Sequence, residues 1–141
     1  MPFRKKTDDG AERLAKIELF EGFSHAELAR VAELVEEVQA EPGAVLTEQG
    51  KPGQECYIVV EGEAVFEVGG ERKASIHPGE PIGEMALIDN RPRSGTVRAV
   101  TAMKLLALDA KRFRMLLDEM PKANRAIMSK LSERLRNLDL A

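Results

Sequence analysis

The first forty residues carry apolar side chains at helical spacing. Leu14, Ile17 and Phe20 recur every third residue and predict a helix over residues 11–20. Ser24 and Glu27 then form a capping box, in which each side chain can bond to the backbone amide of the other. The residues after this box place one apolar face along a helix: Leu28, Val31, Leu34, Val35 and Val38. We therefore predict a second helix that runs from the capping box through Val38.

From residue 41 the pattern changes to short apolar runs between turns. Turn signals recur about every ten residues, at 42–43, 50–53, 61–63, 69–70 and 77–79. Runs rich in β-branched, aromatic and other apolar residues lie among and after them, at 57–60, 64–68, 96–100 and 103–108. Evenly spaced short strands are typical of an antiparallel sandwich or barrel.

The last third of the chain returns to helical spacing. Asp109 has a side chain suited to capping a helix N-terminus, and Pro121 is expected to break or restart the helix that follows. Before the proline, an apolar stripe is formed by Phe113, Leu116, Leu117 and Met120. After it, residues 122–138 are amphipathic, with a heptad seam formed by Met128, Leu131, Leu135 and Leu138. This seam can pack against the sandwich of the same chain or against the helix of a second copy.

The composition fits one folded domain and excludes several classes of protein. Hydrophobic residues make up 43% and charged residues 32% of the 141, a balance typical of a globular chain. A net charge of −3 argues against the broad basic field that drives nucleic-acid binding, and no apolar run is long enough to cross a membrane. We therefore predict one mainly β domain of the α+β class over residues 1–141. An antiparallel sandwich or jelly roll at 41–108 would be flanked by a tail and helices at 1–40 and by helices at 109–141.

Neither the N-terminus nor the single cysteine indicates export. The basic stretch at residues 1–6 lacks the apolar core of a secretory signal, so we expect a solvated tail. Cys56 precedes a predicted strand and has no histidine or basic neighbour to activate it, so we expect a buried, inert thiol. Both features suit a reducing cytoplasm, which is the location that we expect.

No residue pattern in the sequence indicates catalysis or a metal site. His25 and His77 are the two histidines, and neither has a histidine or cysteine partner at metal-ligand spacing. We expect both on the surface. No serine, histidine and aspartate stand in the order of a catalytic triad, so a bound ligand would be sensed and not turned over.

Residues 83–96 offer the chemistry that the rest of the chain lacks. Good helix formers at 84–88 predict a short helix among the strands. Gly83 lets the backbone approach a ligand closely, and the free amides of a helix N-terminus attract anions. Arg93 can add a forked contact to a phosphate, Ser94 can donate a hydrogen bond, and Glu84 can accept one from a hydroxyl. From the residues alone, the segment is either an anion-plus-hydroxyl site or a surface turn with a solvated arginine.

The order of these residues closely resembles the phosphate-binding cassette of the cyclic nucleotide-binding domain family. That family includes bacterial catabolite activator proteins, the regulatory subunits of cyclic-AMP-dependent kinase, and cyclic-nucleotide-gated channels. Its pattern is Gly-Glu-(Leu/Met)-Ala-Leu, a short loop, and Arg-(Ser/Ala/Thr)-Ala-Thr, which residues 83–87 and 93–96 resemble. Further landmarks match at Pro42-Gly43, Gln49-Gly50, Tyr57-Ile58 and Glu61-Gly62. The resemblance covers about residues 18–138.

The resemblance implies a role for each matching residue. Arg93 would pair with the cyclic phosphate, and Glu84 would bind the ribose 2′-hydroxyl. The backbones at 83 and 86 would contact ribose and phosphate, and Val65 on a neighbouring strand would face the purine. The full set predicted to line the ligand is Gly83, Glu84, Met85, Ala86, Arg93, Ser94, Gly95 and Val65. Two departures bear on affinity, since Pro81-Ile82 replaces an aromatic residue common before Gly-Glu and Gly95 replaces the usual alanine.

The resemblance also implies a function and a mode of signalling. The ligand would be cyclic AMP or cyclic GMP, and by the resemblance Ser94 favours cyclic AMP. No other cofactor is expected. The C-terminal helix at 122–138 would act as a lid that moves toward the bound base. We expect a homodimer through this helix, or packing within one chain, and an unidentified downstream protein partner. No nucleic-acid or membrane partner is expected.

Two alternatives compete with the sensor interpretation. The first is a degenerate module that keeps the fold, binds no nucleotide and serves protein interaction; the intact pair of Glu84 and Arg93 argues against it. The second is nucleic-acid binding by basic residues of the last helix, for which a solvated face is the default: Arg125, Lys130, Arg134 and Arg136. The chain ends soon after this helix, so we expect no helix-turn-helix of the catabolite-activator kind. A stand-alone sensor and a regulatory piece of a larger protein both remain open.

Overall fold

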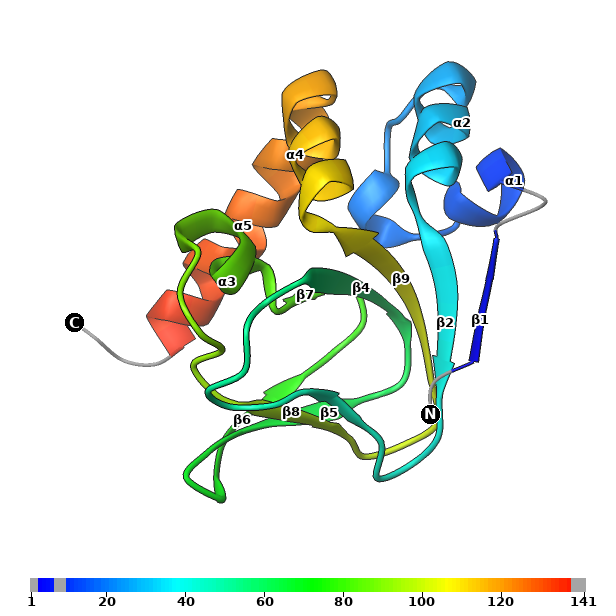
Figure 1. Ribbon diagram of the computed structural model, residues 1–141. Coiled ribbons are helices and arrows are strands. Elements are labelled where there is room, and N and C mark those ends of the chain that lie inside the picture. The colour runs from blue at the N-terminus through cyan, green and yellow to red at the C-terminus, as the bar shows by residue number, and fades with distance from the viewer. Residues whose placement is uncertain (1–2, 7–9, 138–141) are drawn as a thin grey trace.

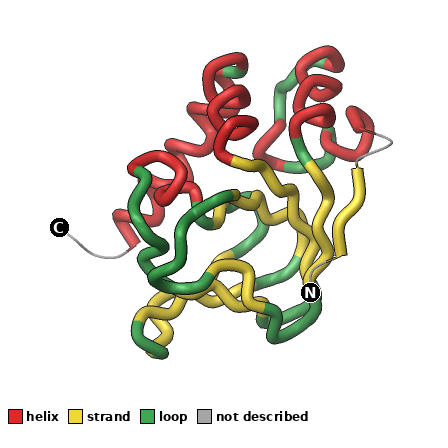
Figure 2. The backbone as a smooth tube through the Cα atoms, viewed as in Figure 1, coloured by secondary structure: helices red, strands yellow, loops and turns green. Residues whose placement is uncertain are grey.

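The computed structural model describes residues 3–6 and 10–137, and it places two antiparallel sheets face to face (Figures 1 and 2). The first sheet has the strand order β1-β2-β9-β4-β7. Its strands are β1 (Phe3–Lys6), β2 (Glu36–Ala40), β9 (Met103–Asp109), β4 (Glu55–Glu61) and β7 (Pro81–Ile82). The second sheet has the order β3-β8-β5-β6. Its strands are β3 (Val45–Thr47), β8 (Thr96–Ala99), β5 (Ala64–Val68) and β6 (Glu71–Ile76).

The helices gather at one side of this sandwich, as Figure 1 shows. They are α1 (Gly10–Leu14), the 3-10 turn η1 (Glu18–Phe20), α2 (His25–Leu34), α3 (Glu84–Asp89), α4 (Ala110–Glu119) and α5 (Pro121–Asn137). The predicted capping box is confirmed, because the amide of Glu27 donates to Ser24 Oγ (3.1 Å) and the amide of Ser24 to Glu27 Oε1 (2.8 Å). Asp109 caps α4, since its carboxylate accepts from the amide of Arg112 at 2.7 Å. Pro121 restarts the helix as predicted, as the first residue of α5.

The core has two layers because the central strands are buried on both faces. In β4, Tyr57 and Val59 point between the two sheets, whereas Cys56 and Ile58 point toward the helices. This alternation follows from the two-residue period of a strand. The helices cover the outer face of the first sheet with residues that are 0–3% exposed, among them Val31, Phe113, Leu116 and Ile127.

Three expectations for the first forty residues are wrong. The second helix ends at Leu34 and not at Val38, because residues 36–40 form β2 and pair with β9. Val38 is fully buried between the sheets, opposite Leu105. Residues 3–6 are not a solvated tail, since they form β1 and pair with β2. The helix expected over 11–20 is split into α1 and η1.

The predicted fold class is confirmed as a mainly β antiparallel sandwich flanked by helices. Each strand predicted at 57–60, 64–68, 96–100 and 103–108 corresponds to an observed one, with bounds that differ by at most two residues. Within residues 3–6 and 10–137, no helix has both the length and the apolar character needed to span a bilayer.

Candidate functional site

The short helix predicted within residues 83–96 is present as α3, and a left-handed glycine introduces it. Gly83 has φ 78° and ψ 10°, a conformation that residues with a side chain adopt at a cost. Asn90, with φ 57°, closes the helix in the same left-handed region, which asparagine tolerates better than most residues. The chain therefore leaves β7, makes one compact turn of helix and returns toward β8.

Arg93 is packed against the backbone of Gly83 and is only 9% exposed. Its Nη1 donates to the Gly83 carbonyl at 2.8 Å, and its Nη2 donates to the carbonyl of Glu55 at 2.6 Å. A Cβ at position 83 would collide with Nη1, so this glycine supplies space as well as conformation. The Arg93 backbone is also fixed, because its amide donates to Lys51 O and its carbonyl accepts from Gly50 N, both at 2.9 Å. The surface-turn interpretation, with a solvated arginine, is therefore wrong.

Glu84 is a buried carboxylate, 1% exposed, and it is paired with α5. Its Oε1 accepts a hydrogen bond from Arg134 Nη1 at 2.9 Å, while Arg134 Nη2 donates to the Pro81 carbonyl at 2.6 Å. Burial raises the pKa of Glu84 above its ordinary value, although the charges of Arg134 and Arg93 and a backbone hydrogen bond act in the opposite direction. The expectation of a solvated basic face is wrong for Arg134, whose side chain is 27% exposed.

The other predicted residues of the cassette differ in exposure. Ala86 is 7% exposed and packs so closely on Gly53 that a Cβ there would collide with it. Met85 is 56% exposed, and Ser94 is also exposed. Gly95 is buried. The structure therefore bonds Arg93 to Gly83 and buries the adjacent Glu84 against Arg134, and it leaves the Met85 and Ser94 side chains at the surface.

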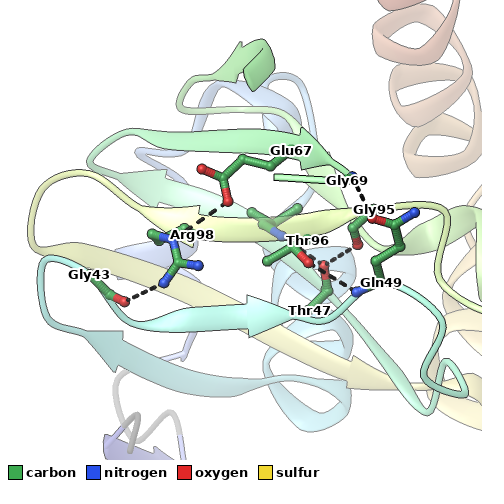
Figure 3. Close-up of polar contacts among 9 residues, drawn as sticks. Gly43, Thr47, Gln49, Glu67, Gly69, Gly95, Thr96 and Arg98 are labelled. Atoms are coloured by element: carbon green, nitrogen blue, oxygen red, sulfur yellow. Dashed lines mark hydrogen bonds and ion pairs between the residues drawn. The ribbon is translucent and has the colours of Figure 1, made fainter. Parts of the chain in front are cut away.

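Hydrogen bonds from a neighbouring strand and turn fix the end of the cassette, as Figure 3 shows. Thr47 Oγ1 donates to the Gly95 carbonyl at 3.4 Å and accepts from the amide of Val97 at 3.2 Å. The amide of Gln49 donates to Thr96 Oγ1 at 3.0 Å, and Gln49 Oε1 accepts from the amide of Gly69 at 2.8 Å. Residues 95–97 are thus tied to β3, to the segment after it and to the β5–β6 turn.

Strand alternation does not favour the prediction that Val65 faces a ligand inside the sandwich. Val65 is 8% exposed but belongs to neither core cluster, whereas its neighbours Ala64 and Phe66 both pack on the cluster between the sheets. Successive side chains of a strand point to opposite faces, so Phe66 is the inward residue. The prediction from the sequence named Val65 and not Phe66, although the alternation counted from Ala64 indicates that Phe66 points inward.

A hollow of about 530 Å³ opens beside Arg93. Strands β3 and β4, the segment between them, Arg93 and the end of β9 line it. The lining residues are Leu46, Thr47, Glu48, Lys51, Pro52, Gln54, Glu55, Tyr57, Arg93 and Asp109. Arg93 is the one predicted site residue among these, so the hollow adjoins the cassette without containing Glu84. Its charged residues have both signs.

The remaining candidate groups lie outside this site. His25 and His77 are exposed, as predicted. Cys56 is a buried free thiol, as predicted, and burial raises its pKa well above the usual range of a cysteine. Within the residues that the structure describes, no group of three or more histidine, cysteine, aspartate or glutamate side chains is placed to hold a metal ion.

Comparison with known proteins connects this arrangement to one family. The sequence model described as "Cyclic nucleotide-binding domain" matches residues 37–120. A cAMP-dependent protein kinase regulatory subunit of Dictyostelium discoideum is 34% identical over 124 residues, which cover 80% of this chain and 38% of that protein. The chain therefore spans well under half the length of this curated relative.

Two solved structures share the architecture over most of the chain. A cAMP-binding acyltransferase from Mycobacterium smegmatis superposes with a TM-score of 0.81 at 27% identity, covering 90% of this chain and 41% of that one. The catabolite activator protein of Thermus thermophilus superposes with a TM-score of 0.71 at 31% identity, covering 86% of this chain and 60% of that one.

Proposed function

The chain belongs to the cyclic nucleotide-binding domain family, and we propose that it is a regulatory sensor whose ligand is cyclic AMP. The choice of cyclic AMP is supported by the resemblance of this chain to a cAMP-dependent kinase regulatory subunit and a cAMP-binding acyltransferase. Cyclic GMP is the second ligand to test, because nothing in the cassette side chains excludes it. We propose the cytoplasm as its location.

The burial of Arg93 and Glu84 on the two sides of Gly83 in one cassette is the observation that supports this proposal, with Arg93 bonded to the Gly83 carbonyl and Glu84 next to it in the chain. A cyclic phosphate bears one negative charge, and burying that charge without a partner is unfavourable. Arg93 is nearly buried and already held in place by two carbonyls, and a guanidinium has five N–H groups with which to donate. Glu84, the first residue of α3, supplies an acceptor for a ribose hydroxyl. The positive charge of Arg93 suits the phosphate of the ligand, and the Glu84 carboxylate suits a hydroxyl of its ribose.

Helix α5 is the element through which we propose that binding is signalled. Arg134 of α5 bonds to the same Glu84 carboxylate that would accept the ribose hydroxyl. A ligand that changes the hydrogen bonding of Glu84 therefore changes the strength of the contact between Glu84 of the cassette and Arg134 of α5. A ligand with different affinity for two positions of α5 shifts their populations by that difference.

The test is calorimetric titration of cyclic AMP into the protein and its Arg93→Ala variant. Truncating one member of a buried, hydrogen-bonded charge pair costs about 2–5 kcal/mol, so we expect an affinity loss of roughly 30- to 4000-fold. Arg91→Ala is the matched control, because Arg91 lies in the same loop and is exposed. Equal affinities of the Arg93 variant and the wild-type protein would refute the assignment of the phosphate contact.

Thermal unfolding with each nucleotide distinguishes the sensor from a degenerate module. A ligand at 100 times its dissociation constant adds about 2.7 kcal/mol to the free energy of unfolding. We expect a higher melting temperature with cyclic AMP. Unchanged melting with both cyclic AMP and cyclic GMP would favour the module that binds no nucleotide.

A further inference from the structure

Thr47 carries a buried hydroxyl beside the two charged residues of the candidate site. Among the residues that the structure describes, those with a buried charged or aliphatic polar side chain are Glu84, Arg93 and Thr47, at 1%, 9% and 6% exposure. Glu84 and Arg93 are the proposed ligand contacts, whereas Thr47 lies outside the cassette, at the end of β3. Burying a hydroxyl is unfavourable unless it is hydrogen-bonded, so the partners of Thr47 show what its burial serves.

The Thr47 hydroxyl binds the end of the cassette. Thr47 Oγ1 donates to the Gly95 carbonyl at 3.4 Å (Figure 3) and accepts from the amide of Val97 at 3.2 Å. The register of β3 against β8 shifts between Val45 and Thr47, and at this irregularity the Thr47 side chain accepts from the β8 backbone. The hydroxyl thus joins β3 to the residues that follow Arg93.

The methyl group of Thr47 faces the start of the cassette. A Cβ placed on Gly83 would lie 3.4 Å from Thr47 Cγ2, and the same Cβ would collide with the Arg93 guanidinium. Glu84 follows Gly83 directly in the chain. Thr47 also lies with Arg93 on the wall of the hollow described above. One side chain therefore lies at both ends of the segment that carries the two proposed ligand contacts.

We propose that Thr47 is a positioning residue for ligand binding, which sets the separation between the Glu84 carboxylate and the Arg93 guanidinium. This inference rests on the proposed function. In a cyclic nucleotide the phosphate is closed into a ring with the ribose, so the separation between the phosphate and the 2′-hydroxyl is nearly fixed. A site that already holds its contacts at the matching separation loses less conformational freedom on binding. Thr47 acts on the sugar phosphate contacts and therefore affects all cyclic nucleotides alike.

The experiment is calorimetric titration of cyclic AMP and cyclic GMP into the wild-type protein, Thr47→Val and Thr47→Ser. Thr47→Val keeps the shape of the side chain and loses its hydroxyl. The loss of this hydrogen bonding predicts that both nucleotides bind roughly 2- to 13-fold more weakly, by the same factor for each. Thr47→Ser keeps the hydroxyl and should restore most of the affinity.

Thr101→Val is the matched control, because Thr101 makes the same pair of bonds at the turn between β8 and β9. Its Oγ1 accepts from the amide of Glu63 at 3.0 Å and donates to the Ala102 carbonyl at 2.9 Å. We expect this variant to melt at a lower temperature and to bind both nucleotides as the wild-type protein does. An equal loss of affinity in the two valine variants would assign the effect to general destabilisation and overturn the positioning role.

Two further results would overturn the role of the hydroxyl while the proposed function stands. One is a Thr47→Val variant that binds cyclic AMP as tightly as the wild-type protein, and the other is an equal loss in Thr47→Val and Thr47→Ser. A wild-type protein that binds no cyclic nucleotide refutes the proposed function and this inference with it.

A double-mutant cycle tests whether Thr47 acts through Arg93. Arg93→Lys keeps a positive charge but lacks the planar fork of donors. Thr47→Val should therefore reduce the affinity by a smaller factor in the Arg93→Lys background than in the wild-type protein, because the group that it positions is already altered. Equal factors in the two backgrounds contradict the proposal.

Hydrogen exchange of the wild-type protein gives a second measurement if Thr47→Val fails to fold. The Val97 amide donates to Thr47 Oγ1, and the Glu63 amide donates to Thr101 Oγ1. If Thr47 holds the cassette in its binding geometry, cyclic AMP should slow exchange of the Val97 amide and leave the Glu63 amide unchanged. Exchange of the Val97 amide that is the same with and without bound cyclic AMP contradicts the positioning role.

Discussion

At the scale of single residues, Gly83 meets two separate demands, one from its own backbone and one from Arg93. Its left-handed φ of 78° disfavours any side chain, and a Cβ would displace the Arg93 guanidinium. Gly79 is a matched comparison, because it has φ 87° but would meet only the flexible end of Lys130, at 3.7 Å.

We expect Gly83→Ala and Gly79→Ala to differ in binding more than in stability. Each should lower the free energy of unfolding by about 1–2 kcal/mol, which is the cost of a left-handed backbone with a side chain. Only Gly83→Ala should also weaken cyclic AMP binding, because it moves the proposed phosphate contact. Chemical denaturation and calorimetry measure the two effects. Equal affinities of the two variants would show that the guanidinium tolerates the displacement.

The buried carboxylate of Glu84 makes a second residue-scale prediction, about pH. Its pKa is raised in the folded protein, so the folded state binds the proton more tightly than the unfolded state does. Stability from this group is therefore present below the ordinary pKa of 4.5 and is lost as the pH rises through the raised value. Glu84→Gln stays neutral and still accepts a hydrogen bond from Arg134.

We expect Glu84→Gln to gain thermal stability relative to the wild-type protein as the pH rises from 4 to 7. Melting curves of both proteins across this range measure the difference. A gap that narrows with rising pH would show that the ion pair with Arg134 outweighs the cost of burying the carboxylate.

The sequence predicted the charged members of the candidate site but not their partners. Arg93 and Glu84 lie in one segment, residues 83–96, whose residue order resembles the phosphate-binding cassette of the family. Arg134 is fifty positions away from Glu84 in the chain, and on its own helix it belongs to a basic face that was predicted to be solvated. Phe66 and Val65 point to opposite faces of β5, and the alternation from Ala64 along the same strand identifies Phe66 as the inward one. A contact between distant segments decided the case of Arg134.

At the scale of elements, the boundary between α2 and β2 shows that the same apolar residues can fit both the spacing of a helix and the alternation of a strand. Leu34, Val35 and Val38 fit a helical face, but Val38 and Ala40 also alternate as a strand does. The helical pattern predicted a continuation through Val38. Pairing of residues 36–40 with β9 decided against it, because burial of Val38 between two sheets is available only in the strand.

Helix α5 is held at both ends by polar contacts with other elements. Near its start, Lys122 Nζ donates to the Gly22 carbonyl at 3.1 Å and to Glu27 Oε1 at 3.0 Å. Toward its end, Arg134 bonds to Glu84 and to the Pro81 carbonyl. The end near Arg134 is therefore the one that the cassette can hold or release.

We expect Arg134→Ala to loosen the last turns of α5 and to destabilise the protein. The substitution leaves the buried Glu84 acceptor without its partner, which costs about 1–3 kcal/mol. Hydrogen exchange should become faster in residues 130–137 and change less near Lys122. Arg136→Ala is the control, because Arg136 is exposed on the same turn. Indistinguishable exchange in the two variants would mean that apolar packing alone holds this end.

At the scale of the whole molecule, the sandwich was predictable and its outer edge was not. Turn residues and short apolar runs predicted β4, β5, β8 and β9, which are four of the nine strands among the described residues. Strand β1 has no such signal, because Phe3–Lys6 is one apolar residue followed by three basic ones. It forms by pairing with β2, more than thirty residues away. An edge strand of this kind depends on a partner that local sequence does not reveal.

The residues of the predicted heptad seam in α5 have two different environments: some pack on the domain and others are exposed at the surface. Leu131 is half-buried and packs on the helical core cluster, whereas Met128 and Leu135 are 48% and 56% exposed. Leu138 lies outside the described residues. Met128 and Leu135 are seven positions apart and so share one face of the helix. Packing within the chain therefore uses one part of the seam and leaves an apolar pair for a second copy.

This division predicts a dimer that forms through the exposed pair. Light scattering at several concentrations should give a mass that rises toward twice that of the monomer. A double variant, Met128→Lys with Leu135→Lys, should stay monomeric, because it places like charges on the face where the two helices would meet. Ser129→Lys adds a charge to an exposed position of the same helix and should not prevent association. A wild-type mass that stays at the monomer value would assign the whole seam to packing within one chain, and any signal carried by α5 would then pass to a different protein.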